Sequence, residues 1–151
     1  VVALDRERHA QLFSEVKEVG AQLHLMGDGD ISAAIWASEA DGPYDLLLGI
    51  GAAPEGVITA TALRGLGGVF EGRLKFRSEE ERIRAEGMVG GDLDRLWTAK
   101  ELCRSSDAVF VATGVCSGYL PGVEHLAEGI KTTSQVIDVT SGKVSRIETI
   151  H

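Results

Sequence analysis

Apolar residues along the chain follow two alternating patterns, one with helical spacing and one with the short runs of strands. Leu12, Val16 and Val19 recur at helical intervals, and Gly20 follows as a stop signal. The segment 107–113 (DAVFVAT) is almost continuously apolar, which predicts a strand buried on both faces. Such alternation predicts an α/β fold with a mixed sheet covered by helices. The predicted helices are 9–19, 31–37, 56–66, 78–87 and 97–104, and the predicted strands are 21–26, 44–50, 69–76, 107–113, 134–140 and 143–150, the last two forming a hairpin around Ser141-Gly142.

Composition narrows the class of protein. The chain has 151 residues, of which 44% are hydrophobic and 25% charged, as expected for one domain spanning 1–151. A net charge of -8 argues against a nucleic-acid partner, because proteins that bind nucleic acid concentrate lysine and arginine. No apolar run approaches the roughly 20 residues of a membrane span, so we expect no membrane contact and a cytoplasmic location. The chain begins at Val1 inside an apolar segment and not at methionine, so we expect a piece of a longer protein.

Cysteine usage adds little to this picture. Cys103 and Cys116 lack the paired spacing of a metal or redox motif. We expect both to be reduced, partly buried thiols.

Three glycine-containing loops follow predicted strands: GDGD at 27–30, GAAPEG at 51–56 and ATGVCSGYL at 112–120. Ligands of open α/β sheets bind beyond the carboxyl ends of strands, so we expect these loops to converge on one crevice. Asp28 and Asp30 would then accept hydrogen bonds from sugar hydroxyls or bind a hard cation, with Gly29 allowing close approach. The alternative is a tight turn capped by the two aspartates.

Two further groups are candidates for the same crevice. Glu55 follows Pro54 at the predicted first turn of a helix, where the helix dipole favours negative charge, although this explains such a glutamate even without a ligand. Arg6 and Arg8 flank Glu7 in DRERH and could clamp a phosphate, with His9 as a further donor. The alternative for this cluster is a solvated helix start.

Other reaction classes lack their motifs. The sequence has no GxSxG, GxxxxGK[ST] or HExxH pattern, and GLGG at 65–68 follows a helix where a dinucleotide fingerprint would follow a strand. His24, inside a predicted strand, is interpreted as a structural histidine.

The motifs DRERH, LMGDGDI, GIGAAPEGVITATALRGLGGVFEGRL and FVATGV, in this order, resemble the carboxyl-terminal half of class II fructose-1,6-bisphosphatases. The resemblance covers nearly the whole chain. The family includes bacterial enzymes that also hydrolyse sedoheptulose-1,7-bisphosphate. It implies a sugar-phosphatase-like carboxyl-terminal domain. It also implies that most metal-binding carboxylates lie in an amino-terminal half outside these residues.

The resemblance also implies roles for individual residues. Glu55 would be a ligand to a catalytic Mn²⁺ or Mg²⁺ ion. The sugar would be held by Asp28, Gly29 and Asp30, and the uncleaved phosphate by Arg6, Glu7 and Arg8. Ala52 would lie against the substrate, at a position where the family pattern GIGGAPEG has glycine. Glu7 replaces the proline of DRPRH, and Cys116, Ser117 and Tyr119 alter the loop ATGVTDGDLL.

The implied function is metal-dependent hydrolysis of the 1-phosphate of fructose-1,6-bisphosphate, in gluconeogenesis or Calvin-type sugar metabolism. This chain would supply substrate-binding residues and one metal ligand, and would be inactive by itself. The implied partners are the sugar bisphosphate and other copies of the enzyme in a homo-oligomer. The alternative is a non-catalytic sugar-phosphate-binding or regulatory domain derived from that family.

Overall fold

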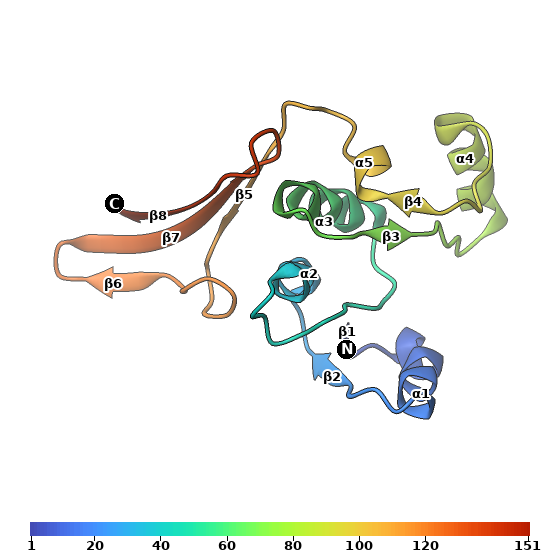
Figure 1. Ribbon diagram of the computed structural model, residues 1–151, viewed down its shortest axis with the longest axis horizontal. Helices are drawn as coiled ribbons and strands as arrows, with labels where there is room; N and C mark the ends of the chain where they lie inside the picture. The colour runs from blue at the N-terminus through green and yellow to red at the C-terminus, as the bar shows by residue number, and fades with distance from the viewer.

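The computed structural model describes residues 1–151 and confirms the α/β class (Figure 1). Its strands form three separate sheets, one parallel and two antiparallel. None of the helices combines the length and the hydropathy that a membrane crossing requires. The helices are η1 (Glu7–His9, a 3-10 turn), α1 (Ala10–Glu18), α2 (Asp30–Ser38), α3 (Ala53–Leu66), α4 (Glu79–Val89) and α5 (Ala99–Leu102). The strands are β1 (Val2–Leu4), β2 (His24–Met26), β3 (Glu71–Gly72), β4 (Trp97–Thr98), β5 (Val109–Thr113), β6 (Glu124–Leu126), β7 (Gly129–Asp138) and β8 (Val144–Ile150).

The N-terminal part is a small parallel layer. β1 pairs with β2 on one edge, and on its other edge Val2 bridges Leu47 in parallel. β1 is buried along its whole length, as expected for the central strand of a parallel arrangement. α2 and α3 lie together in the middle of the molecule (Figure 1).

The C-terminal part is an antiparallel sheet in which the long strand β7 pairs with β5 and β6 on one edge and β8 on the other. Its inner face packs on α2 and α3 through a buried cluster of Ile35, Ala62, Phe110 and Ile137. The predicted hairpin is confirmed, with Gly142 at φ +68° in the turn. This cluster fixes α3, and therefore its N-terminus, relative to the sheet.

Most of the predicted helices are confirmed because local signals define their ends. α1 ends before Gly20 at φ +75°, and α3 ends at Gly67 at φ +73°. Ser78 caps α4 by accepting a hydrogen bond from the Glu81 amide. The prediction of a helix over 97–104 is partly wrong, because Trp97–Thr98 pairs with β3 and the helix begins at Ala99.

Two predicted strands form only in small part. The segment 44–50 contributes a single bridge at Leu47, and of 69–76 only Glu71–Gly72 is a strand. Both segments line the same pocket, so that a cavity lies where they would have to meet. Both segments have the apolar pattern of a strand, but a strand also needs a neighbour within hydrogen-bond distance.

The prediction that 107–113 is buried on both faces is wrong. Phe110 points into the core and is buried, whereas Val109 and Val111 are 55% and 59% exposed. The apolar side chains Val109 and Val111 on the outer face of β5 therefore do not reflect burial within this chain.

Candidate functional site

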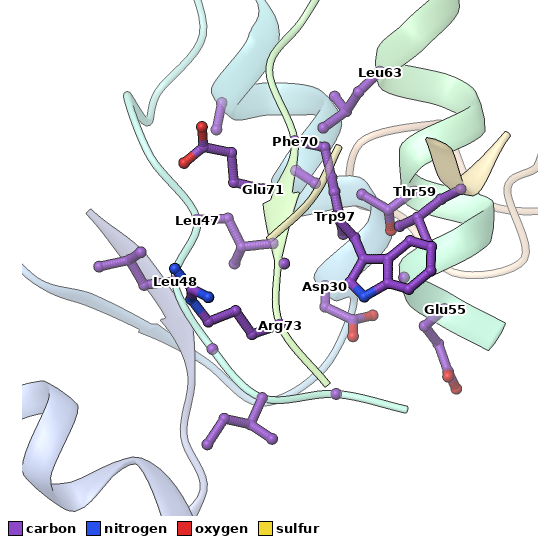
Figure 2. Close-up of a pocket in the computed structure, with 18 of the residues that line it drawn as sticks. Asp30, Leu47, Leu48, Glu55, Thr59, Leu63, Phe70, Glu71, Arg73 and Trp97 are labelled. Carbon is purple, nitrogen blue, oxygen red and sulfur yellow. The ribbon is translucent and has the colours of Figure 1, made fainter. Parts of the chain in front are cut away.

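A pocket of about 1100 Å³ lies beside the N-termini of α2 and α3 (Figure 2). Its walls are α2, the segment 45–53, the start of α3 and the segment 68–75. Leucine, valine and aromatic side chains cover much of it, including Leu47, Leu63 and Phe70. Figure 2 shows Asp30, Glu55 and Trp97 on one side of the pocket and Arg73 on the other. This combination of apolar walls and a few polar groups is typical of small-molecule sites.

Glu55 occupies the position that the sequence predicts, in the first turn of α3. The helix starts three residues earlier than the predicted residue 56, because Ala52 is extended at φ -81° and ψ 155° and Pro54 suits the first turn. No side chain caps this end, so its free N–H groups make it electropositive. Glu55 Oε2 is buried and has no hydrogen-bond partner.

An unpartnered buried carboxylate oxygen is costly unless a donor or a cation meets it. A carboxylate oxygen is also the ligand that Mg²⁺ and Mn²⁺ prefer. The residues present therefore fit one ligand position of a divalent ion. No group of three or more His, Cys, Asp or Glu side chains in this chain is arranged to hold a metal. Further ligands would have to come from outside these residues.

The two aspartates of GDGD are separated by the fold. Asp30 begins α2 and lines the pocket, whereas Asp28 is exposed and lies outside it. Asp30 Oδ1 accepts the Ile31 amide at 3.0 Å. Asp30 Oδ2 lies beside Gly51, and a Cβ added to Gly51 would be 3.5 Å from this oxygen, an ordinary contact distance. Gly29 between them has φ +91°, which a residue with a side chain rarely adopts. Asp28 Oδ1 accepts the Gly29 amide at 2.9 Å, as the turn alternative predicts.

The DRERH cluster lies against the same loop from outside. The Arg8 Nε donates to the Ile50 carbonyl at 2.8 Å, so this guanidinium sits beside the loop that leads to Ala52. Arg6 donates to the Asp5 carbonyl, and none of Arg6, Glu7 and Arg8 lines the pocket. Ala52 lines it and is exposed.

His9 is not a free donor for a ligand, which corrects the expectation from sequence. The residue is 2% exposed, and its Nε2 accepts the Ile50 amide at 2.9 Å. The proton is then on Nδ1, which donates to the Leu4 carbonyl at 2.9 Å. Gly49 approaches so closely that an added Cβ would be 3.3 Å from the His9 ring. His9 therefore connects the pocket-lining segment 45–53 to the end of β1.

The third predicted loop does not join the other two, so the expected convergence is wrong for residues 112–120. Tyr119 donates to Glu39 at 2.7 Å, accepts from Gln135 at 2.8 Å and packs edge-on against Trp36. Burial, together with the hydrogen bond to Glu39, raises the pKa of Tyr119 to about 12. These contacts hold the loop against the C-terminal end of α2, away from Glu55.

Sequence reasoning missed Trp97, Arg73 and Thr59, which line the pocket. Trp97 Nε1 is buried without a partner, and the Arg95 guanidinium stacks on the indole at 3.6 Å from the ring centre. Arg73 donates to the Asp94 carbonyl at 2.6 Å. The arginine of EGRL was the signal that could have identified one of them, but no pattern marked Trp97.

The remaining sequence interpretations concern residues outside the pocket. His24 is exposed, and its ring lies tilted against Tyr44 with ring centres 5.1 Å apart. Both cysteines are free, Cys103 buried and Cys116 exposed. Gly65 serves close packing, since an added Cβ would lie 2.5 Å from Ile137 Cγ2.

Comparison with known proteins identifies the family of this chain. A family model described as bacterial fructose-1,6-bisphosphatase, glpX-encoded, matches residues 1–151. The D-fructose 1,6-bisphosphatase class 2/sedoheptulose 1,7-bisphosphatase of Trichodesmium erythraeum is 40% identical over 164 residues, covering 100% of this chain and 48% of the relative. The protein of that name from Synechococcus elongatus is also 40% identical, with 48% of its length covered. The chain thus spans about half the length of these curated relatives. It belongs to the family of bacterial glpX-encoded fructose-1,6-bisphosphatases.

Proposed function

We propose that this chain is the substrate-binding half of an enzyme that hydrolyses the 1-phosphate of fructose-1,6-bisphosphate with Mn²⁺ or Mg²⁺. The observation that carries the proposal is the buried, unpartnered Oε2 of Glu55 in the large pocket of a chain from this family. The names of the relatives support fructose and sedoheptulose bisphosphates as the substrate class.

Glu55 would hold a divalent ion through Oε2, at the free N-terminal end of α3. When bound, such an ion stabilises negative charge on phosphate oxygens and lowers the pKa of water. The α3 dipole adds positive potential for a phosphate at the same place. Glu55 alone cannot complete the coordination, because Mg²⁺ demands about six ligands. We therefore expect the isolated chain to be inactive.

Asp30 would accept hydrogen bonds from the sugar hydroxyls, because its carboxylate lines the pocket and Gly51 leaves space beside it. Arg8 would bind the uncleaved phosphate. Its Nε is engaged with Ile50, which leaves the guanidinium's other nitrogens as donors. We keep for Asp28, Gly29, Arg6 and Glu7 the roles that the resemblance implies, although none of them lines the pocket in this chain.

The departures from the family pattern fall at the rim of the pocket and outside it. Ala52 adds a methyl group at the N-cap of α3, where the family pattern has glycine. Glu7 adds a negative charge between two arginines and weakens their attraction for phosphate. We propose that both changes weaken substrate binding without altering the metal position.

A hybrid enzyme tests the proposal: the Trichodesmium relative in which this chain replaces the segment that it matches. Phosphate release from fructose-1,6-bisphosphate is measured with Mn²⁺ for the isolated chain, the hybrid enzyme, and the hybrid enzyme carrying Ala52→Gly. We expect no turnover by the chain, turnover by the hybrid enzyme, and a lower KM after Ala52→Gly. Turnover by the isolated chain, or none by a folded hybrid enzyme, would refute the proposal.

The second candidate is a non-catalytic sugar-phosphate-binding domain. The observation that favours it is the absence of a complete metal-ligand group within this chain. Calorimetry separates the two, because this candidate requires the isolated chain to bind fructose-1,6-bisphosphate while the folded hybrid enzyme releases no phosphate.

A further inference from the structure

The outer face of the C-terminal sheet carries almost no charge. Side chains alternate across a strand, and directly paired residues share a face, so the registers define this face. β5 contributes Val109, Val111 and Thr113, opposite Asp138, Val136 and Ser134 of β7. β8 contributes Ser145, Ile147 and Thr149. Asp138, at the end of its strand, is the only Asp, Glu, Lys or Arg among these nine residues.

The inner face has the opposite character. Beyond the buried Ile137 and Phe110 it carries charged residues, with Lys131 Nζ 3.3 Å from both Glu124 and Glu148. An antiparallel sheet with one solvated face normally places its polar residues on that face. Here the face without helices is the one with almost no charge. In Figure 1 the sheet reaches away from α2 and α3, and no helix lies on its other side.

The edge of the same sheet is also open. β5 pairs only with β7, so its other edge presents free backbone groups. Beside this edge lies a groove of about 320 Å³, lined by Ile58 and Thr61 of α3 and by Val109–Val111. Exposed edge strands are usually protected by lysine, proline or a bulge, and β5 (VFVAT) has none of these. Ile58 is 44% exposed, so the apolar surface continues from the sheet onto the helix.

We propose that this outer sheet surface (Ile58, Val109, Val111, Val136 and Ile147) is the docking site for the part of the polypeptide that the relatives have and this chain does not match. The relatives are about twice as long as their matched segments, which supplies an occupant of sufficient size. A second copy of the chain fits less well, because each copy carries a net charge of -8 and the two would repel. A face with a single charged residue and four aliphatic side chains, next to an open edge, suits a permanent contact within one polypeptide.

Cysteine labelling tests this proposal without reference to catalysis. Val111→Cys is made in the isolated chain and in the hybrid enzyme, and modification by a thiol reagent is followed peptide by peptide by mass spectrometry. We expect Cys at 111 to react at least about tenfold more slowly in the hybrid enzyme, because the site must open before the reagent reaches it. Val19→Cys, at an 80% exposed position after α1, is the matched control and should react at similar rates in both. Equal reactivity at position 111 in the two proteins overturns the proposal.

Two further results decide between occupants. Light scattering of the isolated chain should give a monomer, and a dimer in which Cys at 111 is protected would assign the surface to a second copy instead. If the hybrid enzyme does not fold, the unmatched segment of the Trichodesmium relative is expressed separately and mixed with the chain. Co-purification that is lost in Val111→Lys and retained in Val19→Lys supports the proposal, and failure to co-purify, or equal co-purification, overturns it.

Discussion

Gly65 allows α3 to approach the sheet closely, and its replacement by alanine should move them apart. The added Cβ would lie 2.5 Å from Ile137 Cγ2 and 3.4 Å from the Val139 Cα. Ile137 is fully buried, so its methyl group has little space to move into. α3 also carries Glu55, which makes this contact relevant to the pocket.

Two effects of opposite sign set the magnitude. Glycine to alanine inside a helix stabilises by about 0.5–1 kcal/mol. Forcing an extra carbon into a packed core costs about 1–3 kcal/mol. A contact far below van der Waals distance with a buried neighbour belongs to the upper part of that range. We therefore expect Gly65→Ala to lower the free energy of unfolding by about 1–2 kcal/mol.

Urea unfolding followed by circular dichroism measures this change, with Gly56→Ala in the same helix as the matched control. An added Cβ at Gly56 meets only Phe70 Cζ at 3.8 Å, an ordinary contact, so the control should keep or raise the stability. Gly65→Ala in an Ile137→Ala background should cost clearly less, because the blocking methyl is gone. An increase in stability for Gly65→Ala equal to that of Gly56→Ala would refute the packing argument.

Three other predictions follow from single contacts. Because the pKa of Tyr119 is raised from 10.0 to about 12, its neutral form stabilises the fold fully below pH 10.0, and this stabilisation is lost as the pH rises to about 12. Phenolate absorbance in a Tyr44→Phe variant checks this, and titration of Tyr119 at its ordinary pKa would contradict it. The amides of Leu47 and Gly49 have no hydrogen-bond partner in the chain, so hydrogen exchange should be fast there, and strong protection would contradict the open pocket. Arg8→Ala in the hybrid enzyme should raise KM for the bisphosphate more than it lowers kcat, because the phosphate contact exists in both ground and transition states. An unchanged KM would remove Arg8 from the phosphate site.

Local signals predicted the helices and the position of Glu55. Pro54, the helical spacing after it and Gly67 are sufficient to place α3 and its first turn. Long-range contacts decided what the sequence did not predict. The loop 112–120 turns away from the pocket because Tyr119 bonds to Glu39 and Gln135, which are distant in sequence. The DRERH motif suggests His9 as a donor to a ligand. Only the fold shows that its ring is engaged with Ile50 instead.

The faces of the strands were the least predictable feature. Val109 and Val111 read as core residues, yet they are exposed in this chain. An apolar pattern reports that a face is buried somewhere, in the chain or against another part of the protein, and it does not identify the partner. The segments 44–50 and 69–76 also have the apolar pattern of strands. They line the same pocket and do not pair with each other.

Manganese binding by the hybrid enzyme tests the central claim most directly, because Glu55 is proposed as a metal ligand. Free Mn²⁺ is quantified by electron paramagnetic resonance during titration of the hybrid enzyme, its Glu55→Gln variant and a Glu86→Gln control, in which the altered side chain lies exposed on α4. Glu55→Gln keeps the shape and removes the charge. We expect Glu55→Gln to raise the Kd for Mn²⁺ by at least about tenfold, because replacing even a residue that only orients a metal ligand weakens binding by about that factor. Glu86→Gln should leave the Kd unchanged. Equal Mn²⁺ affinity in all three folded proteins would show that Glu55 does not hold the metal.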